Sequence, residues 1–197
     1  MSDIINRLSL NAFRAGVTPR SKESREWFFK KASNLRSINR RELMKEKALK
    51  KRTAVDNKTL IGSMQMFYYD PKHKDTLPYY DVFPLVIVVG PAKGGFYGLN
   101  LHYLPPMLRM KFFNELMKIQ GSKLTDDTKF AITYKMLKRT SSMRFFKPCL
   151  KHYLNKHVTS DFAEVPAPEW EVAAFLPTSQ FKKANSKKVY YDSRQEI

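Results

Sequence analysis

The residues most able to support metal-dependent chemistry are three aspartates in one short stretch. Asp70, Asp75 and Asp81 lie within residues 70–81, and carboxylate oxygens are the ligands with which a nuclease holds magnesium. Asp70, however, precedes Pro71 in a polar segment. Aspartate is common in turns because its side chain hydrogen-bonds the local backbone. We therefore expect a turn at this position and no metal site.

The four histidines and the single cysteine do not form a metal-binding motif. His73 and His102 are isolated, and His152 and His157 are five residues apart. That spacing differs from the i, i+4 spacing that places two histidine ligands on one face of a helix. Cys149 has no second cysteine with which to form a disulfide bond or a zinc site. The sequence therefore predicts neither a metal ion nor another cofactor.

Motifs for nucleophilic catalysis and nucleotide binding are also missing from the sequence. No serine or cysteine lies in a nucleophile elbow, and residues 90–95 have neither the GxGxxG nor the Walker spacing. We predict that the protein is not an enzyme. One alternative stays open, a small-barrel nuclease, because the apolar run at 83–87 would also suit a strand of a toxin barrel. His102 and Asp81 would be the residues to test for it.

Positive charge dominates the composition and is distributed unevenly. The 197 residues include 36 Lys and Arg against 18 Asp and Glu, a net charge of +18. Residues 1–54 hold 15 basic and 5 acidic residues, residues 55–177 hold 16 and 11, and residues 178–197 hold 5 and 2. We predict three corresponding parts: a basic N-terminal helical arm (1–54), an α+β core domain (55–177) and a basic C-terminal tail (178–197).

The basic arm favours binding to a polyanion, of which nucleic acid is the commonest. A merely solvated helix face is one alternative, but solubility needs a net charge of only about 2–8 in a small domain. An anionic membrane surface is another, although the apolar face of the arm is short for a helix that lies on a membrane. Phosphate contacts set affinity rather than base specificity, so we expect salt-sensitive binding. The predicted phosphate contacts are Arg25, Lys30, Lys31, Arg36, Arg40, Arg41, Lys45, Lys50, Lys51 and Arg52.

Aromatic residues are crowded between residues 67 and 103. On a sheet, such rings form either a stacking platform for unpaired bases or a small hydrophobic core. Adjacent rings such as Tyr79 and Tyr80 point to opposite faces of a strand. We therefore expect most of these rings in the core and some at the surface.

The hydrophobic pattern predicts a scaffold of mixed α+β class. Apolar runs at 60–69, 79–89 and 96–103, separated by turn residues, predict a small curled antiparallel sheet, an SH3-like barrel or a similar form. A further strand is expected at 169–176, and residues 1–20 are expected to be a loosely ordered lead. Helices are predicted from Ser21, at 40–51 after the capping pair Asn39 and Glu42, and at 106–120, 125–137 and 148–157.

The central block also resembles a known family. Its runs are YDPK at 69–72, LPYYDVFPL at 77–85 and GFYGLNLHYLPP at 95–106, followed by WEV at 170–172. They are similar to virion proteins of T4-like tailed bacteriophages, and the nearest family is that of the DNA end-protector (head-completion) proteins. The likeness covers about residues 58–195. It implies a protein that sits on the ends of packaged double-stranded DNA and blocks host exonucleases, and it implies no catalytic or ligand residue.

Charge and resemblance together predict a non-enzymatic virion protein that binds double-stranded DNA, at its ends, during head completion. The expected partners are DNA ends and other phage head, neck or tail proteins, with a homo-oligomer left open and no membrane. The expected location is the virion, and the host cytoplasm during assembly. The alternative is a structural neck, tail or baseplate subunit whose basic arm contacts neighbouring virion proteins.

Overall fold

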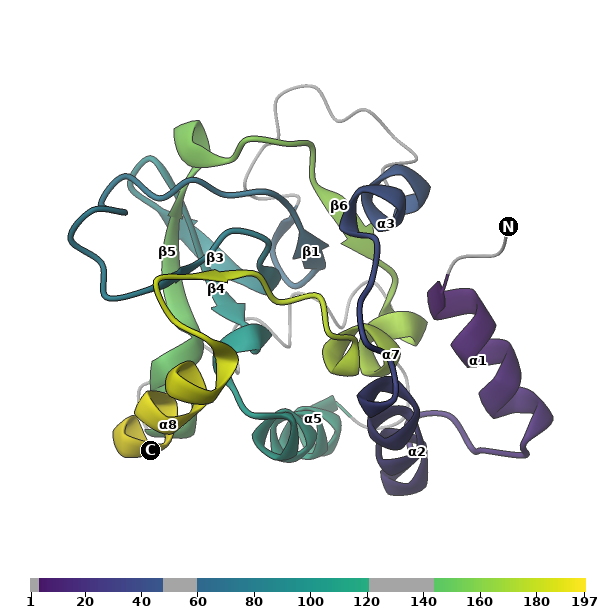
Figure 1. Cartoon of the computed structure of the whole chain (residues 1–197). Coiled ribbons are helices and arrows are strands. Elements are labelled where there is room, and N and C mark those ends of the chain that lie inside the picture. The colour runs from purple at the N-terminus through teal and green to yellow at the C-terminus, as the bar shows by residue number, and fades with distance from the viewer. Residues whose placement is uncertain (1–3, 48–59, 121–143) are drawn as a thin grey trace.

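The computed structural model describes residues 4–47, 60–120 and 144–197, and within these ranges the fold is α+β (Figure 1). The strands are β1 (Met64–Met66), β2 (Tyr80–Asp81), β3 (Leu85–Ala92), β4 (Gly95–Asn100), β5 (Leu150–Leu154), β6 (Ala163–Val165) and β7 (Phe181–Lys182). The α-helices are α1 (Ile4–Arg14), α2 (Lys22–Ser33), α3 (Arg40–Lys47), α5 (Pro106–Gln120), α7 (Trp170–Phe175) and α8 (Ser186–Glu196). Short 3-10 helices are η1 (Leu101–Tyr103), η2 (Arg144–Cys149), η3 (Asn155–His157) and η4 (Ala167–Glu169).

The main sheet is antiparallel and open, with the strand order β5-β4-β3-β1-β6. The predicted α+β class is therefore confirmed, and the curled sheet does not close into a barrel. The predicted strand at 79–89 is divided into β2 and β3. Pro84 lies in this break and has no N–H with which to continue a ladder. β2 pairs instead with β7 in a separate two-stranded sheet.

Glycines allow β4 to pack closely against its neighbours. A Cβ atom at Gly95 would lie 1.8 Å from the carbonyl oxygen of Tyr153 in β5. A Cβ atom at Gly98 would lie 2.1 Å from Cγ1 of Val86 in β3. Any larger residue at these positions would push the strands apart.

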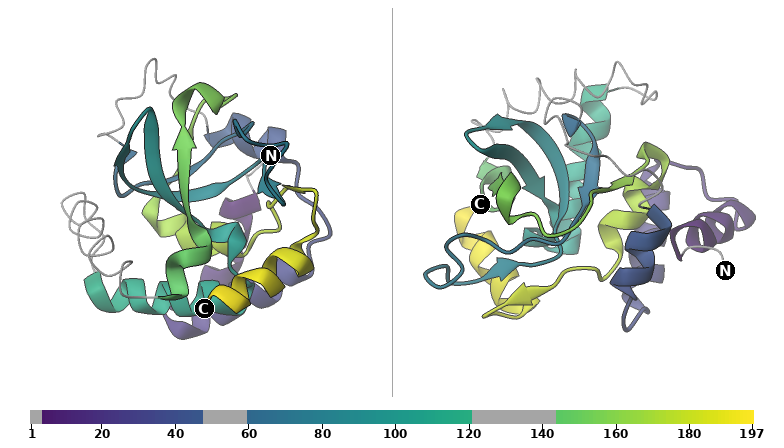
Figure 2. Two further views of the ribbon diagram at one scale, coloured as in Figure 1. Left: turned by 90° about the vertical axis from the view of Figure 1, so that its left-hand side faces the viewer. Right: turned by 90° about the horizontal axis from the view of Figure 1, so that it is seen from above.

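The N-terminal helices share a hydrophobic core with the sheet. Ile5 and Leu8 of α1, Phe28 of α2 and Leu43 of α3 are buried in the cluster that includes Leu85 of β3. Helices α1, α2 and α3 lie to one side of the sheet, whereas α5 and α8 lie beneath it (Figures 1 and 2). The predicted boundary at residue 54 lies outside the described residues, so the division into three parts stays a prediction.

Helix starts were predictable where a polar side chain caps the first turn. The Ser21 hydroxyl accepts a hydrogen bond from the Ser24 amide at 3.0 Å at the start of α2. The Asn39 side chain accepts one from the Glu42 amide at 3.2 Å at the start of α3. These caps confirm the predicted starts of both helices. The structure also confirms the helix predicted at 106–120, while the one predicted at 125–137 lies outside the described ranges.

Three predicted elements are wrong. Residues 1–20 are not a loose lead but contain α1, whose buried residues Ile5, Leu8 and Ala12 follow one helical face. The expected helix at 148–157 is mainly β5, because pairing with β4 satisfies its backbone. The expected strand at 169–176 is α7, in which every residue is buried. A fully buried segment has no polar face, so its period cannot separate a short helix from a strand.

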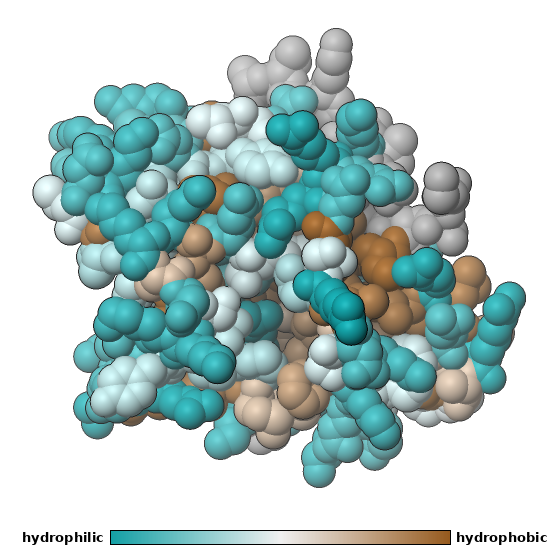
Figure 3. Space-filling view, in the orientation of Figure 1, coloured by the Kyte–Doolittle hydropathy of each residue, from teal (hydrophilic) through white to brown (hydrophobic). Residues whose placement is uncertain are grey.

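Hydrophilic side chains cover most of the face seen in Figure 1, as the space-filling view in Figure 3 shows. Apolar residues reach this face chiefly in the region between α3 and α1. Leu10 and Phe13 of α1 are 52% and 80% exposed. The surface is therefore largely polar, with an apolar area next to the N-terminal helices.

Candidate nucleic-acid interface

The predicted phosphate contacts divide into three groups in the structure. Five of them have exposed side chains on α2, on α3 or on the segment between these helices: Lys30, Lys31, Arg36, Arg41 and Lys45. Arg40 is half-buried and Arg25 is buried. The remaining residues, Lys50, Lys51 and Arg52, lie outside the described part of the chain.

Arg25 has a structural partner. Its Nη1 atom donates to Oε1 of Glu171 in α7 at 2.7 Å, and each side chain is only 6% exposed. The other oxygen of Glu171 accepts hydrogen bonds from the Ser24 hydroxyl at 2.8 Å and the Arg20 amide at 3.0 Å. Arg25 therefore ties α2 to α7, and we leave it out of the proposed DNA-contacting set.

Arg40 binds the backbone of a segment far away in the sequence. Its Nε atom donates to the carbonyl oxygen of Thr178 at 2.7 Å, and its Nη2 atom donates to that of Ser179 at 2.8 Å. Two bonds from one planar group fix the guanidinium in position. Arg40 thus holds the start of α3 against the segment that leads into β7.

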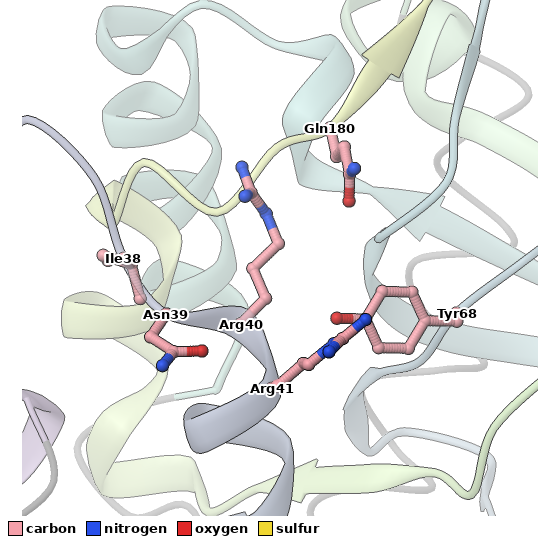
Figure 4. Close-up of a pocket in the computed structure, with 6 residues that line it drawn as sticks. All are labelled: Ile38, Asn39, Arg40, Arg41, Tyr68 and Gln180. Carbon is pink, nitrogen blue, oxygen red and sulfur yellow. The ribbon is translucent and has the colours of Figure 1, made fainter.

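An open pocket of about 570 Å³ lies at this junction, next to the first turn of α3 (Figure 4). Its walls come from the start of α3, from the chain after β1 and from the chain before β7. The lining residues are Ile38, Asn39, Arg40, Arg41, Tyr68 and Gln180. The only charged groups among these six residues are the two guanidinium groups, so the pocket favours an anion.

A buried polar network around Asp81 is linked to the pocket through Gln180. The Oδ2 atom of Asp81 is 2.6 Å from Nδ1 of His102 and accepts from the Asn100 side chain at 3.2 Å. Its Oδ1 atom accepts from the backbone amides of Phe83 at 3.1 Å and Gln180 at 3.0 Å. Four hydrogen bonds thus satisfy this carboxylate inside the protein.

The network continues from His102 to Thr178, whose hydroxyl lies 2.9 Å from Nε2. Burial lowers the pKa of His102, with Asp81 opposing this effect. Burial also acts to raise the pKa of Asp81, but His102 and the hydrogen bonds from Gln180 and Asn100 outweigh it and hold that pKa below its usual value. The result is an aspartate beside a neutral histidine, which donates from Nδ1 and accepts the Thr178 hydroxyl at Nε2.

This network has the residue types of a catalytic dyad but no access to the surface. The side chains of His102 and Asp81 are 0% and 1% exposed. A general base must come within hydrogen-bond distance of the proton that it removes. The network therefore joins the segment at 178–180 to the sheet, and it gives no support to the nuclease alternative.

The three aspartates considered for magnesium do not form a site. Asp70 binds Lys74 at 2.9 Å on the surface, Asp75 is exposed and Asp81 is buried. No group of three or more potential ligands that could hold a metal occurs among the described residues. The turn predicted at Asp70 is the interpretation that fits this part of the structure.

Most of the crowded aromatic residues form a core. The ring centroid of Phe67 lies 5.9 Å from that of Phe96, 5.3 Å from that of Tyr153 and 4.9 Å from that of Phe162. Tyr97, which is 42% exposed, lies on the outer side of β4 beside His152. A single exposed ring does not make the stacking platform that was considered from the sequence.

The sequence did not indicate three residues at this junction: Tyr68, Thr178 and Gln180. Tyr68 belonged to the aromatic group, and the other two were placed in a polar tail. They meet α3 because the Val82 amide binds the Gln180 carbonyl oxygen at 2.9 Å, next to the β2–β7 pair. This pairing spans about half the chain, and no local motif signals it.

None of the helices within the described ranges is both long enough and apolar enough to span a bilayer.

Two searches for similar proteins, one of curated proteins and one of solved structures, gave no match.

A comparison with protein-family models matched the chain to the family described as the phage T4 terminal DNA protecting protein. The match covers residues 6–195. It confirms the resemblance seen at 58–195 and extends it through α1, α2 and α3. Because nearly the whole chain is matched, the protein belongs to the phage T4 terminal DNA protecting protein family.

Proposed function

We propose that this protein binds the ends of double-stranded DNA without cleaving them and shields them from exonuclease during completion of the phage head. Membership of a family named for protection of terminal DNA supports protection as the role. The net charge of +18 supports direct contact with a polyanion. The site of action would be the phage particle, and the host cytoplasm while the particle is assembled.

The observation that carries this proposal is the set of exposed cations on α2, on α3 and between them. Phe28 and Leu43 anchor these helices in the core, while Lys30 and Lys31 of α2 and Arg36 of the segment after it are exposed. Lys31 lies 5.4 Å from the ring of Trp27, which restricts its position. Basic side chains on rigid helices form a surface that can follow a DNA backbone.

Absence of cleavage is the simplest expectation for such a protein. The acid–base pair considered from the sequence, Asp81 and His102, is buried and hydrogen-bonded inside the protein. A protein that covered DNA ends and also cut them would defeat protection. Incubation of the full-length chain with linear duplex and magnesium should leave the DNA intact.

The central experiment measures exonuclease protection of a blunt-ended duplex over a range of salt concentrations. Neutralising Lys30, Lys31 and Arg36 to glutamine should weaken binding. It should also reduce the slope of log affinity against log salt by about 0.9 for each phosphate that the variant no longer neutralises. The matched control neutralises the exposed residues Lys72, Lys156 and Lys187, which lie outside these helices. Equal losses of affinity in the two triple variants would contradict a DNA-binding surface on α2 and α3.

Substitutions of exposed side chains are preferable to removal of residues 1–54. Such a truncation would expose the core, because Ile5, Leu8, Phe28 and Leu43 are buried in it. A truncated chain that failed to bind DNA would then report unfolding rather than the removal of basic side chains. Exposed side chains can be changed without this effect.

A second function, contact with another head, neck or tail protein, is favoured by the apolar side of α1. Phe13 is 80% exposed and Leu10 is 52% exposed, one turn apart on the same helix. Exposed apolar pairs of this kind are typical of protein contact surfaces. Changing both to serine should abolish association with other virion proteins while leaving the affinity for DNA unchanged. Unchanged association would exclude this side of α1 as the contact.

A further inference from the structure

The open pocket beside α3 has the side chains of an anion-binding site. Arg40 and Arg41 are its charged groups, and none of its six lining residues is acidic. Figure 4 shows the side chains around one hollow, with the guanidinium of Arg40 toward Gln180 and that of Arg41 toward Tyr68 in this view. Guanidinium groups bind phosphate through paired hydrogen bonds in a planar geometry.

Polar groups around the two arginines complete the set of donors. The Asn39 Oδ1 atom caps α3 by accepting from the Glu42 amide, which leaves the Asn39 NH2 group as a donor. The side-chain amide of Gln180 and the Tyr68 hydroxyl are further donors. A phosphate has enough oxygens to accept from several of these groups together.

The pocket is preorganised, because hydrogen bonds within the protein hold Arg40 and the backbone of Gln180 in place. Arg40 uses Nε and Nη2 to bind two carbonyl oxygens, those of Thr178 and Ser179, so its charge is held in place without a ligand. The backbone amide of Gln180 donates to the buried carboxylate of Asp81 at 3.0 Å. Side chains and backbone that are already ordered lose little entropy when a ligand binds.

The charge and the shape of the pocket favour a phosphate at the end of a strand over one inside it. A terminal phosphate monoester carries about −1.5 to −2 at neutral pH, whereas an internal phosphodiester carries one negative charge. The two arginines match the monoester. The volume of about 570 Å³ is within the ~300–1,000 Å³ range of ligand pockets, so it has room for the terminal sugar next to Ile38.

We propose that this pocket binds the terminal phosphate monoester of a DNA strand. The proposal rests on the proposed function, binding of DNA ends, and adds the group that distinguishes an end from the duplex interior. Such a contact recognises the end without reading base sequence. The exposed cations of α2 and α3 would then hold the duplex behind the end.

The test compares three blunt duplexes of identical sequence, with 5′-phosphate, 3′-phosphate or only hydroxyl groups at the ends. Dissociation constants are measured for the full-length protein and for Arg41→Gln. One phosphorylated duplex should bind about tenfold more tightly than the hydroxyl duplex, as expected for one or two charge-assisted hydrogen bonds. The Arg41→Gln variant should lose this preference, and because Arg41 is exposed its replacement leaves the core intact. The 5′ and 3′ duplexes identify which strand end is bound.

The control variant is Lys45→Gln. Lys45 is exposed on the same helix, one turn from Arg41, and does not line the pocket. Its replacement should weaken binding of all three duplexes by the same factor. Equal affinity of the wild-type protein for the three duplexes overturns the pocket proposal but leaves DNA binding standing, as does a preference that survives in Arg41→Gln. Failure to bind any of the duplexes overturns the proposed function as well.

Discussion

Two polar regions of this protein share one segment of the chain, but one is buried and the other is open to solvent. The buried network of Asp81, His102 and Thr178 faces the sheet, while the pocket with Arg40 and Arg41 faces solvent. The segment 178–180 belongs to both, since Thr178 contacts His102 through its hydroxyl and Arg40 through its carbonyl oxygen. The two regions differ in their access to solvent rather than in being polar. Buried polar groups must bind one another, whereas exposed ones remain available to a ligand.

The largest effect should come from changing the charge at the centre of the buried network. Asp81→Asn replaces an acceptor of hydrogen bonds by a group that is half donor, facing His102 and two backbone amides. We expect a loss of about 4 kcal/mol in the free energy of unfolding, as for the loss of two buried hydrogen bonds to a charged acceptor at about 1.5–3 kcal/mol each, measured by chemical denaturation. Asp70→Asn, at an exposed position, serves as the control and should leave the midpoint unchanged. A stable Asp81→Asn protein would show that this network is not what fixes the segment 178–180.

The next effect should separate Arg25 from the exposed cations of the same helix. Arg25→Met leaves the carboxylate of Glu171 buried without its charged partner, so we expect a loss of about 3 kcal/mol in the free energy of unfolding. The salt dependence of DNA binding should not change when it is measured on folded protein. Lys30→Met should behave in the opposite way, with unchanged stability and a weaker salt dependence. A reduced salt slope in Arg25→Met would return Arg25 to the DNA-contacting set.

Local signals predicted much of the scaffold. The strands β3 and β4 followed from apolar runs between turn residues, and the starts of α2 and α3 followed from Ser21 and Asn39 as caps. These elements depend on neighbouring residues, which the sequence displays directly. The same holds for the exposed charge of Lys30 and Lys31.

Long-range pairing explains what the sequence did not predict. Arg25 and Arg36 are both arginines in a basic stretch, and only the approach of Glu171 makes the first one structural. The pocket needs Tyr68 and Gln180 beside α3, which depends on pairing of β2 with β7. Every residue of α7 is buried, so its sequence has no regular alternation of polar and apolar residues from which a helix could be predicted.

The smallest effect should be a pH dependence that belongs to the buried region alone. The pKa of His102 is lowered by burial, and Arg109 and Arg40 add to this against the opposing Asp81. Below pH ~6.5 the unfolded chain therefore takes up a proton at this histidine while the folded protein does not. The free energy of unfolding therefore decreases as the pH is lowered. The loss is at most about 1.4 kcal/mol per pH unit, and it ends once the pH falls to the folded-state pKa. The pKa of Asp81 is also lowered, so its carboxylate contributes fully to stability until the pH falls below ~3.9.

DNA binding provides the matching measurement, because guanidinium groups stay protonated in proteins. Denaturation of the wild-type protein between pH 7 and 5.5 should show the fall, and His102→Gln should flatten it whatever its absolute stability. The affinity of the folded protein for the duplex with only hydroxyl ends should change far less over the same interval, because guanidinium groups and internal phosphodiesters keep their charges. A terminal phosphate monoester, by contrast, itself takes up a proton near pH ~6. An equal fall in the His102→Gln variant would show that His102 is not the source of the pH dependence. A flattened curve would instead assign the pH dependence to His102, which contacts the segment 178–180 through the Thr178 hydroxyl.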